Sequence, residues 1–578
     1  MTPTPSYAAR RAGYFAASAL TAAAGTAAMA VNLAPLGLGG AAAVALAALC
    51  LWWISLGLWS AVIGFALTLR APLPASVPPA PAAQRTAILV PVYNEDCDEV
   101  FAGVRATYES LARTGRLDQF DVFVLSDSTD PAIRHAETAA WEAACRDLDA
   151  GGRLFYRHRD DNRGRKAGNI ADWVRRWGGA YEAFVILDAD SIMSGACLAA
   201  LADRLAAAPR AAIIQTLPLA VGQRSIFGRA VQFSHRLAGP LLARGQAWWQ
   251  GPDSNYFGHN AIVRTRAFAA HCGLPTLDGA PPSGGDILSH DFIEAACLRR
   301  AGWTIHAAPD LPGSYERAPE NLIDYAIRDR RWIQGNLQHL ALVGARGFAP
   351  MSRFHILTGI LAYAMSPLWL ALLLIATPIL STDDGAGGGA LPALALAAPV
   401  LAMLALPRVL GAIALRRRYP KARRGRLVRD VAGELALSAL LAPTLMLLHS
   451  YFIAANFAGR AVDWRPQRRT AHGLAWTEAF ARCAACTIAG TVWGGVVFAT
   501  APTAGLYLLP VLAGLGLAVP LAVWTSRTPA KPDFLPIPED IAPPAEIAAF
   551  ERARASAAEG DRAAAVPGGA MAAVARSA

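Results

Sequence analysis

Charged residues are scarce in this chain of 578 residues. Asp, Glu, Lys and Arg make up 17% of it and hydrophobic residues 54%, whereas about 25% charged residues is usual for a soluble domain. A chain this apolar is not wholly soluble, and its length allows more than one domain. The composition predicts a membrane protein that carries a soluble domain.

Cysteine is also scarce, with 8 residues scattered along the chain. This pattern indicates no disulfide framework, and the cytoplasmic location inferred below argues against disulfides. Cys483 and Cys486 have the spacing of a redox or zinc pair, but no second pair accompanies them. Because they stand at the start of an apolar segment, we interpret them as structural.

The apolar residues gather toward both ends of the chain. In residues 1–70, Gly13–Leu36 and Ala41–Leu69 are each long enough to cross a bilayer, for which about 20 apolar residues suffice. The first of these segments is only mildly apolar, as in a signal peptide. It exceeds the apolar core of about 7–15 residues typical of such peptides and lacks a convincing cleavage site. We therefore expect a retained transmembrane pair.

Three further regions follow a Pro- and Ala-rich linker, Ala71–Ala83. Residues 84–346 have an ordinary soluble composition, and residues 525–578 form a Pro- and Ala-rich tail. We expect that tail to be mostly disordered and cytoplasmic, apart from a short helix near Glu546–Ala557. Residues 354–524 contain the remaining apolar segments, Phe354–Leu380, Leu391–Leu415, Glu434–Phe457, Cys483–Ala501 and Ala504–Trp524.

The basic residues between these segments predict the topology, because Lys and Arg collect in cytoplasmic loops. The loop Arg416–Arg429 contains eight basic residues and no acid, whereas Ser381–Ala390 contains only two acids. Arg460–Arg482 is basic again. Both ends of Glu434–Phe457 then face the cytoplasm, and since Pro443 interrupts its hydrogen bonding, we expect a re-entrant or interfacial pair there. Six spans remain, with residues 84–346 and both termini in the cytoplasm.

The soluble region alternates apolar strands with helices, which predicts a mainly parallel sheet. The expected strands are Thr86–Asn94, Asp121–Asp127, Arg153–His158, Phe184–Asp188 and Ala211–Gln215.

Acidic residues follow two of these strands. Asp127 ends the second, and Asp188 and Asp190 end the fourth. Ligands bind at the carboxyl ends of such strands, and paired carboxylates suit Mg²⁺ or Mn²⁺ carried in with a diphosphate. An isolated Asp-x-Asp is more often a polar turn, but this pair is not isolated.

Three other segments carry candidate site residues. The Gly- and base-rich loop Asn162–Asn169, with Lys166, precedes a helix and suits a phosphate, although a solvated basic loop has the same composition. Asp291 opens a helix, where it is either a reactive acid or an N-cap. Arg328–Gln334, with Arg331 and Trp332, is by its composition a basic juxtamembrane helix with an aromatic anchor.

In this order the segments resemble the processive family-2 glycosyltransferases of the GT-A fold. Asp127, the Asp188/Asp190 pair, Asp291 and the Arg328–Trp332 motif match that family's nucleotide acid, metal motif, general base and acceptor motif. Arg328 stands where cellulose synthases commonly have Gln, which weakens a cellulose or hyaluronan assignment. The resemblance implies an α/β GT-A-type (Rossmann-like) domain inserted in a polytopic helical membrane domain.

Longer stretches are similar to the glucosyltransferases of osmoregulated periplasmic glucan synthesis. The stretches are Val90–Asp96, Leu125–Thr129, Gly258–Asn260, Gly284–Phe292 and Arg328–Asn336. This resemblance implies an inner-membrane enzyme with UDP-glucose as donor, a growing β-glucan chain as acceptor and product, and a periplasmic protein that matures the glucan.

The residue types agree with such a reaction. Asp127, Lys166, Asp188 and Arg331 would bind the nucleotide donor, and Asp188 and Asp190 the metal. Asp291 would act as general base, and Trp332 would stack on an acceptor sugar. The net charge of +10 is accounted for by anionic membrane lipids and the anionic donor, so no nucleic acid partner is expected.

Two alternatives remain. A lipid-directed glycosyltransferase, moving one sugar to a polyprenyl phosphate, would share the donor residues but needs no polymer channel. A transporter with a nucleotide-sensing domain would place charged residues within its spans, and the expected spans have almost none.

Overall fold

A seven-stranded sheet forms the centre of the region between the N-terminal and C-terminal apolar helices. The computed structural model describes residues 6–33, 37–70, 84–381, 390–419, 424–462, 473–531 and 533–565. The predicted linker and the acidic loop around Asp383 lie outside these residues. In spatial order the strands are β3 (Leu154–His158), β2 (Phe120–Ser126), β1 (Thr86–Val92), β4 (Ala183–Ile186), β8 (Ala261–Arg264), β6 (Ala211–Thr216) and β9 (Thr304–Ala308).

The strand directions make this sheet mixed rather than purely parallel. β1 is parallel to β2 and to β4, and Leu89 pairs with Phe123 on one side and Ile186 on the other. β8 runs antiparallel to both β4 and β6. The five strands predicted from the sequence are confirmed. β8 and β9 were not predicted.

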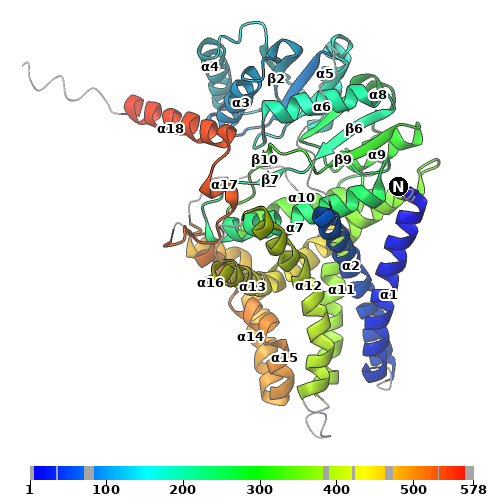
Figure 1. Cartoon of the computed structure of the whole chain (residues 1–578). Coiled ribbons are helices and arrows are strands. Elements are labelled where there is room, and N and C mark those ends of the chain that lie inside the picture. The colour runs from blue at the N-terminus through cyan, green and yellow to red at the C-terminus, as the bar shows by residue number, and fades with distance from the viewer. Residues whose placement is uncertain are drawn as a thin grey trace, which may run out of the picture.

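Helices cover both faces of the sheet (Figure 1). Since neighbouring residues of a strand point to opposite faces, Ile88 belongs to the core that contains Leu198 of α6, and Leu89 to the core that contains Trp173 of α5. The helices are α3 (Cys97–Ala112), α4 (Pro131–Asp147), α5 (Arg165–Trp177), α6 (Gly195–Ala207), α8 (Thr265–His271) and α9 (His290–Arg300), with short 3₁₀ turns η2 (Leu117–Gln119), η3 (Gly178–Ala180) and η4 (His339–Ala341).

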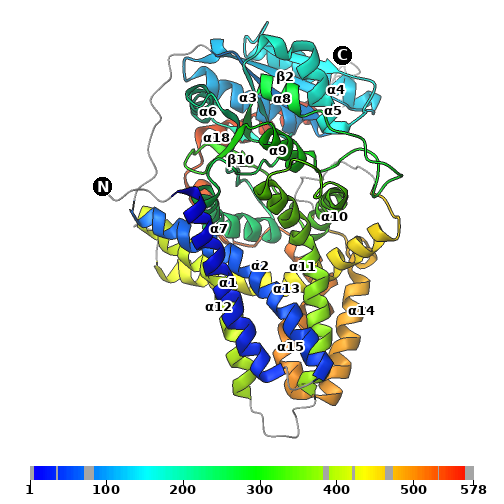
Figure 2. The same ribbon diagram turned by 90° about the vertical axis from the view of Figure 1, so that its right-hand side faces the viewer.

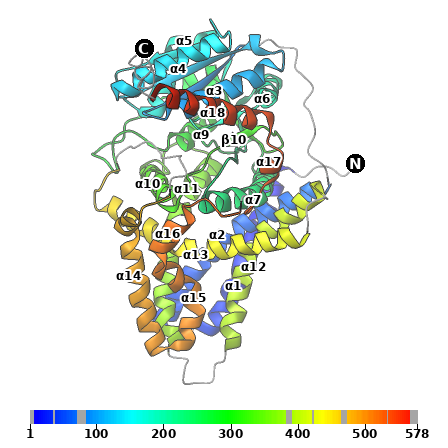
Figure 3. The same cartoon turned by 90° about the vertical axis from the view of Figure 1, so that its left-hand side faces the viewer.

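A second layer lies between this α/β domain and the long helices below it (Figures 1 and 3). Two helices run across the molecule there, α7 (Ile226–Gln250) and α10 (Leu322–Gln338). Beside them is a small sheet of β5 (Ile192–Met193), β10 (Ser314–Glu316) and β7 (Leu219–Ala220). Sequence analysis did not predict α7.

Long apolar helices form the lower part of the molecule (Figure 2). Among the described residues, six helices are long and apolar enough to cross a membrane, so the chain is a multi-pass membrane protein. They are α1 (Tyr7–Leu33), α2 (Gly37–Arg70), α11 (Pro350–Ser381), α12 (Ala390–Arg418), α13 (Arg424–Phe457) and α14 (Trp476–Thr500).

Two glycines bring α2 against α7. A β-carbon added at Gly64 would lie 1.9 Å from the carbonyl oxygen of Leu241, and one at Gly245 would lie 1.9 Å from that of Ser60. The backbones therefore touch, as small residues allow between helices in membranes. This contact joins the N-terminal pair to the layer beneath the α/β domain.

The expectation of a helix pair around Pro443 is wrong, because α13 is one continuous helix through that proline. Both of its ends nevertheless contact parts on the α/β-domain side. At one end Arg426 binds Asp533, and just beyond the other the backbone N–H of Val462 donates to Gln334 of α10 at 2.8 Å. In Figure 3, α13 runs obliquely across the upper part of the helical bundle.

The predicted span Ala504–Trp524 is instead broken into two helices. α15 (Pro502–Gly516) and α16 (Ala518–Thr525) meet at an angle of 62°. α16 turns toward the α/β domain, and Ile226 at the start of α7 donates its backbone N–H to the carbonyl of Arg527 just after α16, at 2.9 Å.

The expectation of a mostly disordered tail is wrong for the described residues 533–545, where Leu535 and Ile537 are buried. α17 (Pro538–Ile541) and α18 (Ala545–Ala565) follow the membrane helices, and α18 lies against α3 of the α/β domain (Figure 3). Ile547 and Phe550 are buried, and Ser110 of α3 donates to Glu546 at 2.7 Å. The predicted short helix is confirmed.

Candidate active site

One cavity collects every site residue predicted from the sequence. Its volume is about 960 Å³, and it lies between the carboxyl ends of the strands, α10 and α11. The predicted residues that line it are Asp127, Lys166, Asp188, Asp190, Asp291, Arg331 and Trp332.

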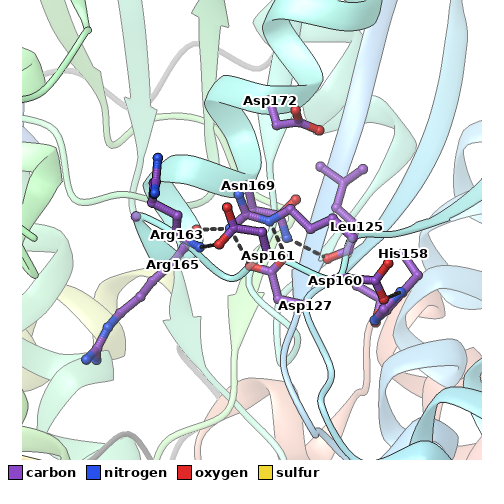
Figure 4. A network of polar contacts seen from close by, with 12 residues as sticks. Leu125, Asp127, His158, Asp160, Asp161, Arg163, Arg165, Asn169 and Asp172 are labelled. Atoms are coloured by element: carbon purple, nitrogen blue, oxygen red, sulfur yellow. Dashed lines mark hydrogen bonds and ion pairs between the residues drawn. The ribbon is translucent and has the colours of Figure 1, made fainter.

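Asp127 follows β2 and is held by an arginine that the sequence analysis did not single out. Arg159 donates from Nε to Oδ1 of Asp127 at 2.5 Å and from Nη2 to Oδ2 at 2.8 Å, and its Nη2 also donates to the carbonyl of Arg165. Burial raises the pKa of Asp127, while Arg159 opposes that rise. Asp127 is thus fixed beside the loop that leads into α5 (Figure 4).

The predicted phosphate loop turns sharply before α5. Gly164 and Arg165 have φ of 69° and 50°, in the left-handed region that glycine adopts readily. The backbone N–H of Gly164 donates to Asp286 at 3.1 Å. This turn directs Lys166 to Asp188, with which it forms an ion pair, and to the carbonyl of Gly258 at 2.8 Å.

Asp188 and Asp190 lie in the turn that follows β4. The backbone N–H of Asp188 donates to the Ser191 hydroxyl at 3.1 Å, and the N–H of Ser191 donates back to the carbonyl of Asp188 at 2.9 Å. Because the chain turns after β4, the side chains of Asp188 and Asp190 do not alternate between the two faces of the sheet as they would along a strand. Both carboxylates therefore line the cavity.

The two carboxylates fit a divalent cation that arrives with a diphosphate. Oxygen donors of this kind suit Mg²⁺ or Mn²⁺, and the ammonium group of Lys166 already binds Asp188. The described residues contain no group of three or more His, Cys, Asp or Glu side chains placed to hold an ion. Its remaining ligands would be water and the oxygens of the diphosphate.

His259 and Glu316 face this acid pair and were not identified from the sequence. Their side chains are 3.7 Å apart, and both line the cavity. Burial works to lower the pKa of His259, but Asp188 and Glu316 outweigh it and raise the pKa. Burial raises the pKa of Glu316. His259 stood within one of the motifs that resemble the family, without a role assigned to it.

Asp291 lies in the first turn of α9, and the helix cap is Ser289. The N-cap interpretation of Asp291 is therefore wrong. Burial raises the pKa of the Asp291 carboxyl, and His290 opposes that rise. The α-carbon of Gly258 faces it, since a β-carbon there would lie 3.5 Å from that of Asp291.

The Arg-Arg-Trp motif lies on α10, which forms the floor of the cavity. Arg331 is buried, whereas Trp332 is 46% exposed. The Arg328 guanidinium lies over two rings, 4.4 Å from the centroid of Tyr325 and 4.3 Å from that of Trp332. Cation–π contacts of this kind orient the indole.

α10 packs directly on the loop that leads to Asp291. Gln338 donates to the carbonyls of Gly284 and Asp286 at 3.1 Å, and His339 bonds the carbonyl of Ser289 at 2.8 Å. Burial lowers the pKa of His339 to about 4. The helix with the Arg-Arg-Trp motif and the turn with Asp291 are therefore joined by three hydrogen bonds.

The cavity continues to the first membrane helix after the α/β domain. Gly359, Ala362 and Tyr363 of α11 line it together with Trp332. The ring of Tyr363 lies 5.6 Å from that of His449 in α13, and His449 bonds Asp329 of α10 at 3.1 Å. The site thus opens onto the membrane helices.

The sheet is of the GT-A type and has these acids at the ends of its strands, and the helix with the Arg-Arg-Trp motif joins it to the membrane helices. These features define a membrane-embedded glycosyltransferase of family 2. The sequence matches "Glycosyl transferase family 2" over residues 87–271 and "Glycosyl transferase family group 2" over residues 183–409. The chain belongs to the glucans biosynthesis glucosyltransferase H family, as its relatives show.

Three of these relatives carry the name glucans biosynthesis glucosyltransferase H. The protein of Cupriavidus pinatubonensis is 44% identical over 86% of this chain and 61% of its own length. That of Ralstonia nicotianae is 41% identical over 88% of this chain and 62% of its own length. That of Xanthomonas euvesicatoria is 42% identical over 88% of this chain and 83% of its own length. The chain thus spans about three fifths of the first two relatives.

Solved structures are more distant. A mannosyltransferase from Pyrobaculum calidifontis, in complex with GDP-Man and Mn²⁺, is 19% identical with a TM-score of 0.41, over 66% of this chain and 100% of that one.

Proposed function

We propose that the protein is an inverting glucosyltransferase of the bacterial inner membrane. It uses UDP-glucose to extend the β-linked backbone of osmoregulated periplasmic glucans. The observation that carries this proposal is the single cavity that brings the donor acids, Asp291 and Trp332 together and reaches α11. The names of the relatives support glucose as the sugar.

The donor would bind at the strand ends. Asp127, fixed by Arg159, would hold the uracil or ribose, and Lys166 and Arg331 would lie near the diphosphate. Asp188 and Asp190 would hold Mg²⁺ or Mn²⁺ together with that diphosphate. Such an ion, when bound, neutralises negative charge that grows on the leaving nucleotide. Lys166 would have to leave Asp188 or share it.

The acceptor would approach from α10. Its terminal sugar would stack on the exposed face of Trp332, and Asp291 would take the proton from the acceptor hydroxyl. The hydroxyl oxygen forms the new bond to the anomeric carbon while the bond to UDP breaks, with its electron pair going to the phosphate oxygen. A single displacement at an α-linked donor gives a β-linkage.

The product would leave through the membrane. Because the cavity is lined by Gly359, Ala362 and Tyr363 of α11, the lengthening glucan would pass from Trp332 to the membrane helices. The α/β domain would face the cytoplasm, where UDP-glucose is made, and a periplasmic maturation protein would receive the glucan on the other side.

The proposal is tested with the full chain in membranes. Incubation with radiolabelled UDP-glucose and Mg²⁺ should give β-linked glucan chains, as shown by sizing and linkage analysis. A single glucose on a lipid-soluble carrier would instead show a lipid-directed enzyme, and no transfer from UDP-glucose would overturn the proposal.

The base is tested by Asp291→Asn, which preserves shape but cannot accept the proton. We expect turnover to fall by about 10²–10⁴-fold while UDP binding is retained. Loss of UDP binding would make Asp291 a structural residue, and unchanged turnover would place the base elsewhere.

A further inference from the structure

Two buried ionisable side chains, His290 and Glu294, flank Asp291 in the sequence of α9. His290 Nδ1 is 3.1 Å from Glu294 Oε1, one helical turn away. Their side chains are 9% and 2% exposed. Within the described part of the chain, Glu294 has no ion-pair partner except His290.

Such a pair needs an explanation beyond packing. Burying two charges costs several kcal/mol per ion, and an apolar pair of similar size is often at least as stable. Moreover, neither the second oxygen of Glu294 nor Nδ1 of His290 has a hydrogen-bond partner within the described residues, so the contact between them is an ion pair. The pair therefore adds little to stability, yet it adjoins the site, where His290 itself lines the cavity.

Because the pair lies next to the site, we propose that His290 and Glu294 are positioning residues for Asp291. The protonated imidazole, held by Glu294, keeps the neighbouring Asp291 carboxylate ionised and ready to accept a proton. This inference rests on the proposed role of Asp291 as base.

The electrostatics of the surroundings agree with this arrangement. Burial works to lower the pKa of His290, but Glu294 and then Asp291 outweigh it and raise the pKa. Burial raises the pKa of Asp291, and His290 is the largest influence against that rise. The other titratable groups that act on these three residues, or respond to them, are Lys166 of α5, His339 after α10, Tyr256 before β8, Cys272 after α8, Cys297 of α9 and Tyr363 of α11.

The sign of the effect follows from the charges. In His290→Gln, Asp291 loses a neighbouring cation and faces the unpaired Glu294 carboxylate, so the pKa of Asp291 rises further. Activity needs the ionised base, and the acidic limb of the pH profile therefore moves to higher pH, by about one unit or more. In the double variant His290→Gln/Glu294→Gln, that unpaired carboxylate is gone, and the limb moves back toward the wild-type position.

The test is the pH dependence of glucose transfer between pH 5 and 8, measured with the full chain in membranes. UDP binding and thermal unfolding are followed beside it. His306→Gln is the matched control, because His306 is a half-buried histidine on β9 outside the cavity. We expect the limb to shift in His290→Gln, to shift back in the double variant and to stay in place in the control.

An unshifted limb in His290→Gln, with transfer lowered equally at every pH, would make the pair structural and overturn the inference. If His290→Gln does not fold, Glu294→Gln decides. Without that carboxylate His290 loses its proton, so the limb should move to higher pH, by less than in His290→Gln because the charge of Glu294 is gone as well. A limb at or below the wild-type pH contradicts the inference. Asp291→Asn separates the two proposals. If that variant is inactive while the limb does not respond to His290, only this inference fails.

Discussion

Asp190 is the second acid of the pair after β4, and its loss should remove one of two carboxylates available to a cation at the cavity. We expect Asp190→Ala to lower transfer by about 10²–10³-fold, as for other losses of charge stabilisation in the transition state. The measurement is the rate of glucose transfer from UDP-glucose in membranes. Immunoblotting of the membrane fraction shows whether the variant is still inserted.

Asp160→Ala is the matched control for Asp190→Ala, since the Asp160 side chain is 95% exposed and does not line the cavity. Transfer near the wild-type rate in Asp190→Ala would contradict the metal assignment, as would an equal loss in both variants.

The strand-end acids were predictable because an apolar strand that stops at a carboxylate is visible in the sequence, and all of them reach the same cavity. The basic residues that bind those acids were not predictable. Arg159 follows β3 and reaches Asp127 at the end of the neighbouring strand β2, and Lys166 reaches Asp188 from another element. Such pairings depend on three-dimensional proximity, which the spacing of residues does not encode.

At the scale of elements, the contact between α10 and the loop before α9 depends on Gly335. A β-carbon there would lie 2.3 Å from the Ser289 hydroxyl and 2.7 Å from its backbone nitrogen. We expect Gly335→Ala to move the turn that carries Asp291. Overpacking of this kind costs about 1–3 kcal/mol, and a shift of about 1 Å at a reacting group can lower turnover by about 10²-fold.

The measurement is turnover of glucose transfer, with UDP binding as a second readout. Gly433→Ala is the control, because Gly433 is a helical glycine of α13 with nothing within 4 Å of an added β-carbon. Equal turnover in the two variants would show that α10 does not position the base.

The contact between α18 and α3 gives a second prediction for an element. Phe550 is 4% exposed and belongs to the core that joins the tail to the layer of α7 and α10. Phe550→Ala should destabilise the protein by about 3–5 kcal/mol, which thermal unfolding in detergent would record as a lower melting temperature. Arg552→Ala changes an exposed residue of the same helix and should leave the melting temperature unchanged. Identical melting temperatures of the two variants would mean that the packing of α18 through Phe550 does not stabilise the protein.

Helix continuity was the least predictable property of the elements. Pro443 suggested a break, yet α13 passes through it, and in membranes neighbouring groups satisfy the backbone that a proline frees. Thr444 donates to the carbonyl of Gly514 at 3.2 Å, which ties the helix to α15 next to that proline. The real bend falls after Gly516, with no proline at the junction itself. The order of β1, β2, β3, β4 and β6 along the chain was predictable, because it follows from the hydrophobic period, whereas β8, β9 and α7 were missed.

For the whole molecule, the side of the membrane on which each loop lies is testable. A reporter active only in the periplasm should be active when fused after Asp384 and silent after Arg426 and Arg469. The first two outcomes follow from the contrast between two acids and eight basic residues. The third follows if both ends of α13 lie on the same side, as the contacts of Arg426 and Val462 with parts on the α/β-domain side suggest.

An active fusion after Arg469 would mean that α13 crosses the membrane, as its length and apolarity allow. The α14 helix and the bent α15–α16 pair would then have to be reoriented. A fusion after Arg70 serves as the control and should be silent, since the α/β domain begins shortly after it.

The docking of α18 on α3 also has a consequence for how the protein is made. A ribosome that has finished η4 has supplied every strand of the large sheet, but α18 begins roughly 200 residues later. At about 5–20 residues per second, this interval lasts about 10 to 40 seconds. During that time one face of α3 in the nascent α/β domain remains uncovered while the remaining helices enter the bilayer. Translation of α18 therefore closes the domain, so a ribosome that stalls after α16 would leave a membrane-inserted chain whose α/β domain is unfinished.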